Sequence, residues 1–282
     1  MTVQSSAADA GISGQAILQA AAEGRKALIG YLPVGYPDLP GSLRALRALC
    51  GDGGEPGVDL VEIGLPYSDP MMDGPVIQTA GTRALERGVR VKDVFAAVQA
   101  VREAGKPAVV MTYWNLVDHY GVRAFARDLA NAGGAGLVTP DLIPEEAGDW
   151  LAAAREYALD RIFLVAPSSS AERIASTAAA CRGWVYATAV MGVTGTREQT
   201  SSAAPELVAR IREYAPGTLV GVGLGVSNGA QVARVAEFAD AVIVGSAFLK
   251  PLIAADSVDG LPGLRAVLAD LVAGVRRAET AN

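Results

Sequence analysis

Three carboxylates in one short stretch are the first residues of this sequence whose types could do chemistry. Glu62 belongs to the apolar segment Val58–Gly64, and Asp69 and Asp73 follow it in a loop bracketed by prolines. No Lys, Arg or His occurs between Ala48 and Thr82 to pair with them. Desolvation without a counter-charge raises the pKa of a carboxyl group. A carboxyl group with a raised pKa is suited to general acid or base catalysis near neutral pH.

Glu62 is predicted to point into the fold. Side chains alternate between the two faces of a strand, so Leu60, Glu62 and Gly64 share one face. The branched side chains of Val61 and Ile63 share the other face, which suits packing against helices. Glu62 then faces inward. The alternative is that Glu62 pairs with a cation from another strand and has a structural role.

Asp69 and Asp73 each allow two interpretations. Asp69 precedes a proline and Asp73 precedes a glycine, and both pairs are common turn formers in which the aspartate caps the backbone. The functional interpretation depends on their setting, because a stiff loop rooted next to an inward acid could hold a second carboxylate above it. The residues themselves do not decide between Asp69 and Asp73.

The elements that must position these acids alternate along the whole chain. Helical periodicity follows each of eight short β-rich runs. The runs are Ala27–Pro33, Val58–Gly64, Pro107–Tyr113, Gly136–Pro140, Arg161–Ala166, Trp184–Thr188, Thr218–Gly223 and Asp240–Gly245. This order leaves a doubly wound sheet or a closed (β/α)8 barrel.

The strand count and the length favour the barrel. A chain of 282 residues matches the usual barrel size of about 250 once a loose tail (residues 1–13) and a preliminary helix near Ser13–Gly24 are set aside. The predicted fold is a single α/β domain, a (β/α)8 TIM barrel with an extra N-terminal helix. Chemistry in such a barrel belongs at the C-terminal ends of the strands.

Glycines at the last three strand ends predict a phosphate site. They lie in the segments Gly192–Gly195, Gly221–Gly225 and Gly245–Ser246. Backbone amides next to a helix N-terminus bind phosphate without a basic side chain, and barrels often hold phosphate at these ends. The long polar segment Met191–Ala204 is predicted to be a mobile lid over this pocket.

Composition and charge exclude several classes of function. The net charge of -6, with basic residues scattered along the chain, argues against a nucleic-acid partner. No apolar run approaches the roughly 18 residues of a membrane span, and no signal peptide is recognisable at the N-terminus. A cytoplasmic protein is therefore expected. Its two cysteines, Cys50 and Cys181, do not make a disulfide framework.

The scarcity of other catalytic side chains narrows the chemistry. His119 is the single histidine, and no cysteine or acid cluster has metal-ligand spacing, so no metal site is expected. None of the four lysines lies in the middle of a predicted barrel strand, which leaves no candidate for a Schiff base. The chemistry that remains is metal-free acid–base catalysis by carboxylates, acting on a phosphorylated substrate.

Several motifs of the chain resemble those of the tryptophan synthase alpha subunit family. The most specific is Glu62–Gln78, which reads EIGLPYSDPMMDGPVIQ. Weaker matches follow in chain order at predicted strand ends: Met111–Asn115, Pro140–Leu142, Gly192–Gly195, Val222–Ser227 and Val244–Ala247. The resemblance extends from about Ala27 to Lys250.

The resemblance implies a barrel that cleaves indole-3-glycerol phosphate to indole and glyceraldehyde 3-phosphate by a retro-aldol reaction. It places Glu62 at the catalytic acid/base position and Asp73 at the second catalytic carboxylate. It assigns the indole and glycerol pocket to Tyr31, Ile77, Met111, Tyr113, Val138, Tyr186 and Thr194. It assigns the phosphate to Gly195, Gly225, Gly245 and Ser246.

The resemblance also implies a partner. The family works as an alpha2-beta2 complex in which the beta subunit holds pyridoxal phosphate and consumes the indole, so no cofactor is expected in this chain. The loop Pro66–Asp73 and the region of Asn115 would face the beta subunit. Departures from the family pattern are Gly30, Pro33, Leu224 and Met71-Met72, which bear on pocket shape and partner contact.

Two other functions stay open at this stage. One is a stand-alone lyase that releases indole without a partner. The other is a catalytically silent phosphate-binding barrel that only activates a partner subunit. The presence of both Glu62 and Asp73 argues against the silent barrel.

Overall fold

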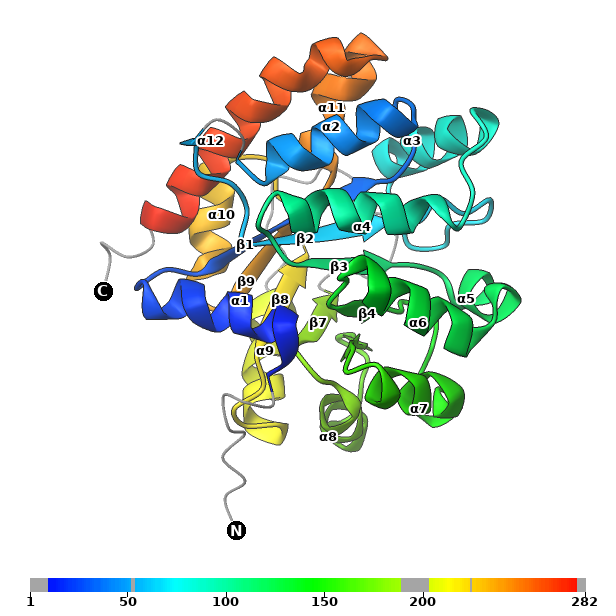
Figure 1. Ribbon diagram of the computed structural model, residues 1–282. Coiled ribbons are helices and arrows are strands. Elements are labelled where there is room, and N and C mark those ends of the chain that lie inside the picture. Colours follow the sequence, from blue (N-terminus) through cyan, green and yellow to red (C-terminus); the bar gives the residue numbers. More distant parts are fainter. Residues whose placement is uncertain (1–9, 52–53, 189–202, 224, 278–282) are drawn as a thin grey trace.

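A parallel sheet of nine strands curls into a barrel at the centre of the computed structural model (Figure 1). The structure describes residues 10–51, 54–188, 203–223 and 225–277. The strands are β1 (Ala27–Pro33), β2 (Leu60–Gly64), β3 (Ala108–Met111), β4 (Gly136–Val138), β5 (Asp160–Ile162), β6 (Leu164–Val165), β7 (Val185–Thr188), β8 (Val220–Gly223) and β9 (Ala241–Val244). Their spatial order is β5-β4-β3-β2-β1-β9-β8-β7-β6, which confirms the predicted barrel.

One predicted strand is divided in two. The run predicted at Arg161–Ala166 breaks at Phe163, so that β5 pairs with β4 while β6 pairs with β7. The Phe163 N–H donates to Cys181 Sγ at 3.5 Å, whereas the Phe163 carbonyl accepts from Tyr186 N–H on β7. The two ends of the sheet are therefore joined through a single residue, and the chain itself closes the barrel.

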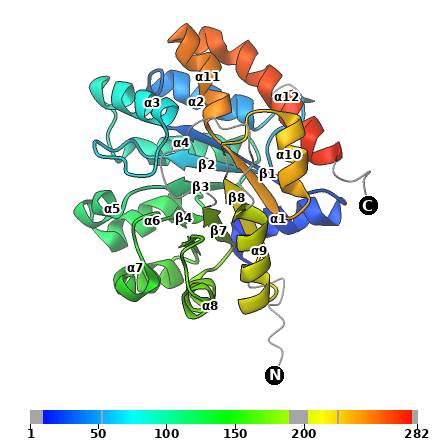
Figure 2. The same ribbon diagram turned by 180° about the vertical axis from the view of Figure 1, so that it is seen from behind.

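Helices surround the barrel on all sides (Figures 1 and 2). The α-helices are α1 (Gly11–Ala22), α2 (Leu39–Leu49), α3 (Pro75–Glu86), α4 (Asp93–Glu103), α5 (Trp114–Tyr120), α6 (Val122–Ala132), α7 (Gly148–Glu156), α8 (Ala171–Ala180), α9 (Ala203–Tyr214), α10 (Gly229–Ala236), α11 (Ser246–Ala255) and α12 (Leu261–Arg277). Two 3-10 turns, η3 (Pro144–Glu146) and η4 (Val258–Gly260), precede α7 and α12. In the described part of the chain, no helix combines the length and apolarity needed to cross a membrane.

The core has an inner and an outer layer, as strand alternation requires. Ile29, Leu60 and Val109 belong to the cluster that fills the inside of the barrel. Val61 and Ile63 belong to the larger cluster between the strands and the helices. The predicted two faces of β2 are therefore confirmed, and Glu62 lies on the inner one.

Helix α1 covers the N-terminal ends of the strands. Its Ile17 packs into the inner cluster, and Ser13 donates from both N–H and Oγ to the buried Asp160 at 2.7 Å. Arg182 pairs with the same carboxylate at 2.8 Å. The predicted extra helix is present but begins at Gly11, so residues 11–13 belong to α1 rather than to a tail. With this end closed, the opposite end of the barrel remains for a site.

Candidate active site

Glu62 lies inside the barrel between apolar neighbours. It stands in register with Tyr31 on β1 and Val109 on β3, whose side chains share the inner face. Its exposed fraction is 1%. Glu62 lies two residues before the C-terminal end of β2, and barrels carry their catalytic residues at these ends of the strands.

The surroundings of Glu62 favour the neutral form of its carboxyl group. Burial, reinforced by the negative charge of Asp73, raises the pKa of Glu62 to about 8. Its Oε1 has no hydrogen-bond partner among the described residues, and no cation of those residues forms an ion pair with it. The structural alternative, a cation from another strand, is therefore not found within the described ranges. A desolvated carboxyl group that titrates near neutrality is equipped for proton transfer.

Asp73 ends the loop between β2 and α3 and is the second desolvated acid. It is partly buried, and burial raises its pKa to about 6. Asp69, four residues earlier in the same loop, is exposed and accepts a hydrogen bond from Ser68 Oγ at 2.5 Å. Asp73 is the loop carboxylate whose charge reaches Glu62. The structure thus separates two aspartates that the sequence alone left equivalent.

Two tyrosines flank the carboxylates inside the barrel. The ring of Tyr31 lies against Gly64, where a Cβ would come within 2.1 Å of its Oη. The hydroxyl of Tyr186 lies against Gly223 in the same way, at 2.6 Å from a built Cβ. Burial first, and then the charges of Asp73 and Glu62, raise the pKa of both phenols well above the usual value. The glycines leave room for aromatic rings that exclude water from the acids.

The other predicted pocket residues lie on the same end of the barrel or just below it. Met111 and Val138 occupy inward positions of β3 and β4, and Val138 is fully buried in the inner cluster. Ile77 lies in the first turn of α3, and Tyr113 immediately precedes α5. Thr194 falls outside the described residues.

Three of the four residues of the predicted phosphate site, Gly225, Gly245 and Ser246, lie within the described residues. Gly245 is the N-cap of α11 and Ser246 is its first residue, with no side chain capping the helix. Gly225 has a φ of 66°, a conformation that favours glycine, and a Cβ there would meet nothing within 4 Å. An uncapped helix N-terminus beside an open backbone turn can bind an anion. Gly195 and the predicted lid up to residue 202 lie outside the described residues, while Ala203 and Ala204 begin α9.

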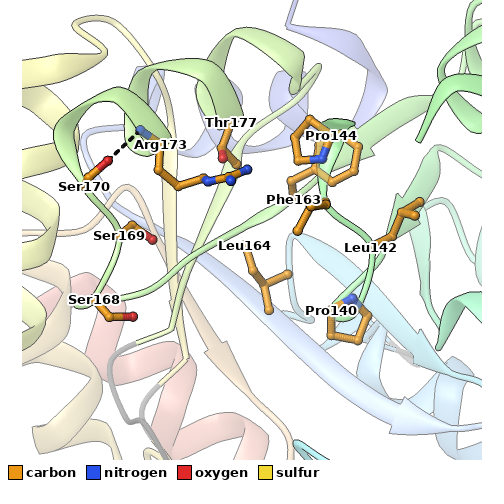
Figure 3. Close-up of a pocket in the computed structure, with 11 residues that line it drawn as sticks. Pro140, Leu142, Pro144, Phe163, Leu164, Ser168, Ser169, Ser170, Arg173 and Thr177 are labelled. Carbon is orange, nitrogen blue, oxygen red and sulfur yellow. Dashed lines mark hydrogen bonds between the residues drawn. The ribbon is translucent and has the colours of Figure 1, made fainter. Parts of the chain in front are cut away.

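A cavity of about 430 Å³ lies between the segment that follows β4 and helix α8 (Figure 3). It is lined by Pro140, Leu142, Ile143, Pro144, Phe163, Leu164, Ser168, Ser169, Ser170, Arg173 and Thr177. None of the predicted site residues that the structure describes is among them. The cationic side chain of Arg173 on its wall is already paired with Glu145 at 2.6 Å. The described residues contain no group of three or more His, Cys, Asp or Glu side chains that could hold a metal ion.

Fold and site together define a (β/α)8 barrel with a pair of desolvated carboxylates at the C-terminal ends of its strands. A family model described as the tryptophan synthase alpha chain matches residues 17–261. The chain belongs to this family.

Relatives support the assignment along nearly the whole chain. The tryptophan synthase alpha chain of Mycobacterium tuberculosis (strain ATCC 25618 / H37Rv) is 59% identical over 255 residues, which are 90% of this chain and 91% of the relative. That of Nocardia farcinica (strain IFM 10152) is 57% identical over 263 residues, 93% of this chain and 95% of the relative.

Solved structures of the family superimpose closely. A structure of Mycobacterium tuberculosis tryptophan synthase matches with a TM-score of 0.87 and 56% identity, covering 95% of this chain and 99% of that chain. A mutant tryptophan synthase alpha-subunit from Pyrococcus furiosus matches with a TM-score of 0.79 and 31% identity, covering 88% of this chain and 99% of that chain.

Proposed function

We propose that this chain cleaves indole-3-glycerol phosphate to indole and glyceraldehyde 3-phosphate, using Glu62 and Asp73 and no metal. The observation that carries the proposal is the pair of desolvated acids, whose pKa values are raised to about 8 and about 6. At neutral pH Glu62 is then protonated while Asp73 is ionised. One carboxyl group can give a proton at the moment when the other stabilises positive charge.

Glu62 begins the reaction by giving its proton to C3 of the indole ring. Positive charge develops on the ring, and the ionised Asp73 accepts a hydrogen bond from the indole N–H and stabilises it. Glu62, now a carboxylate, takes the proton of the side-chain hydroxyl as the bond from C3 to the hydroxyl-bearing carbon breaks. The bond electrons restore the aromatic ring and leave an aldehyde. Glu62 ends protonated, as it began.

The remaining residues of the site bind the substrate. Tyr31 and Tyr186 shield the carboxylates, and the backbone at Gly225, Gly245 and Ser246 would hold the phosphate, together with Gly195. Ile77, Met111, Tyr113, Val138 and Thr194 are the further proposed pocket residues. The indole ring serves as the electron sink, so the reaction needs no Schiff base.

A beta subunit is the proposed partner, in an alpha2-beta2 complex within the cytoplasm, and pyridoxal phosphate chemistry belongs to that subunit. Support comes from exposed apolar side chains on the loops that follow β2 and β4. Met71, 72% exposed, and Met72 follow β2, whereas Ile143, 42% exposed, follows β4. Asn115 is exposed after β3, which lies between them. Exposed apolar side chains on loops at one end of a barrel are a feature of protein interfaces.

Indole release from indole-3-glycerol phosphate tests the proposal. The purified chain is assayed alone and with a tryptophan synthase beta subunit. We expect slow release by the chain alone and faster release in the complex. Equal and strong activity with and without the partner would instead indicate a stand-alone lyase. No release under either condition would refute the enzymatic function.

The pH dependence of kcat/KM should be bell-shaped. The reactive form has Asp73 ionised and Glu62 protonated, so activity should rise with an apparent pKa of about 6 and fall with one of about 8. Because the substrate phosphate also titrates near pH ~6, the acidic limb is assigned by comparison with Asp73→Asn, which should lose the enzyme's share of that limb. Activity that keeps rising above pH ~8 would contradict the role of Glu62 as the initial acid.

A further inference from the structure

Asp73 is held in place through its backbone rather than through its side chain. Its carboxylate receives no hydrogen bond from the described residues, and burial alone accounts for its raised pKa. A catalytic carboxylate must nevertheless be kept within a fraction of an ångström of its working position. The groups that fix the main chain on either side of Asp73 therefore determine where the carboxylate points.

Tyr113 fixes the peptide between Met71 and Met72, one residue before Asp73. Its Oη accepts a hydrogen bond from the Met72 N–H at 3.0 Å. The phenol is 3% exposed, and its ring stacks on Tyr67, at the other end of the same loop, with 5.0 Å between centroids. Tyr113 itself follows β3, which pairs with β2. The ring thus ties both ends of the loop to the barrel.

Gln78 fixes the peptide that follows. Its Nε2 donates to the Asp73 carbonyl at 2.8 Å, while its own N–H donates to Gly74 O at 2.9 Å within the first turn of α3. Pro75 begins α3 and stiffens the entry to the helix. The Asp73 residue is therefore clamped between a phenol from one βα loop and an amide from the helix that follows.

We propose that Tyr113 and Gln78 are positioning residues that orient the Asp73 carboxylate toward the inner face of the barrel at Glu62. The proposal deepens the proposed function and rests on it for its kinetic readout. Tyr113 then has a second role besides lining the pocket, because its hydroxyl binds the loop and not the substrate. For Gln78 the proposal assigns a role where none was predicted.

Tyr113→Phe removes the hydroxyl and keeps the stacked ring, so it tests the hydrogen bond to Met72 N–H separately from the ring contact. We expect kcat to fall about 10- to 100-fold with KM changed less than about threefold. The loop no longer holds the Asp73 carboxylate in its working position, whereas the apolar wall of the pocket remains. Gln78→Met, which keeps the length without the donor, should act in the same direction. Tyr214→Phe is the matched control, since it removes a phenol hydroxyl from an exposed side chain at the end of α9, away from the loop and the carboxylates, and its kinetics should stay at wild-type values.

A double-mutant cycle separates positioning from general structural damage. In the Asp73→Asn background, Tyr113→Phe should lower kcat much less than it does in the wild type, because the group being positioned has already lost its charge. The same loss in both backgrounds would overturn the proposal. So would a Tyr113→Phe variant in which KM rises while kcat is unchanged, the result expected of a pocket wall alone.

Titration of Asp73 tests the clamp even without turnover. Carbon-13 NMR of the γ-carboxyl, assigned with Asp73→Asn, should show the apparent pKa falling from about 6 toward the ordinary value in Tyr113→Phe, as a loosened loop admits water. An unchanged titration would overturn the proposal, whether or not the wild-type chain releases indole. If the Asp73 pKa falls in Tyr113→Phe but the wild-type chain releases no indole, the result would count against the proposed function. The positioning role of Tyr113 would still be supported.

Discussion

Replacement of Glu62 by Gln should lower kcat for indole release by about 10² to 10⁴-fold while leaving KM within a few-fold of the wild type. Burial raises the pKa of Glu62 to about 8, so the wild-type side chain is neutral at pH ~7 and an amide of the same shape fills the same space. What the amide cannot do is give a proton to C3 and take one from the hydroxyl. Steady-state kinetics with the beta subunit present measure the effect, and turnover near the wild-type value would refute the assignment of Glu62.

The same variant carries its own control for folding. A carboxyl group whose folded-state pKa is raised contributes stability below its unfolded value of about 4.5, and that contribution is lost as the pH rises toward about 8. Glu62→Gln avoids the loss. We therefore expect its free energy of unfolding to exceed that of the wild type by about 2–4 kcal/mol at pH ~8 and to equal it at pH ~4. A variant that is inactive and yet more stable cannot owe its inactivity to misfolding.

Replacement of Asp73 by Asn should lower kcat by about 10² to 10³-fold. The amide keeps the shape but loses the negative charge that stabilises the developing indolium. Because the charge of Asp73 also raises the pKa of Glu62, the basic limb of the pH profile should move to lower pH in this variant. Both effects are measured in one series of kcat/KM determinations across the pH range.

Asp69→Asn is the matched control for the loop. Asp69 has the same side chain, lies four residues away and is exposed to water. It should retain the turnover of the isolated chain and both limbs of the pH profile. If Asp73→Asn lowered only the free energy of unfolding and not kcat, the turn-capping interpretation of Asp73 would be correct.

The alternation of side chains along the strand was sufficient to predict that Glu62 lies on the inner face of β2. Alternation along β2 is a property of five consecutive residues, and no distant contact competes with it. The order of strands and helices predicted the barrel for a similar reason, because each element buries one face against its neighbours.

The choice between Asp69 and Asp73 could not be predicted from the local residues. Both are turn formers, and the path of the loop depends on the contact between Met72 and Tyr113, which are 41 residues apart. The break in the strand at Phe163 likewise follows from a contact with Cys181, 18 residues away. Family resemblance selected Asp73, and the structure supplies the physical difference, namely burial near Glu62.

The opposite protonation of the two acids at neutral pH is the central claim, and carbon-13 NMR titration of the free chain tests it most directly. Glutamate δ-carboxyl and aspartate γ-carboxyl labels, assigned with Glu62→Gln and Asp73→Asn, report each group separately. We predict that Asp73 ionises with an apparent pKa of about 6 and Glu62 with one of about 8, so that at pH ~7 only Glu62 carries a proton. Ionisation of both groups by pH ~5 would contradict the account.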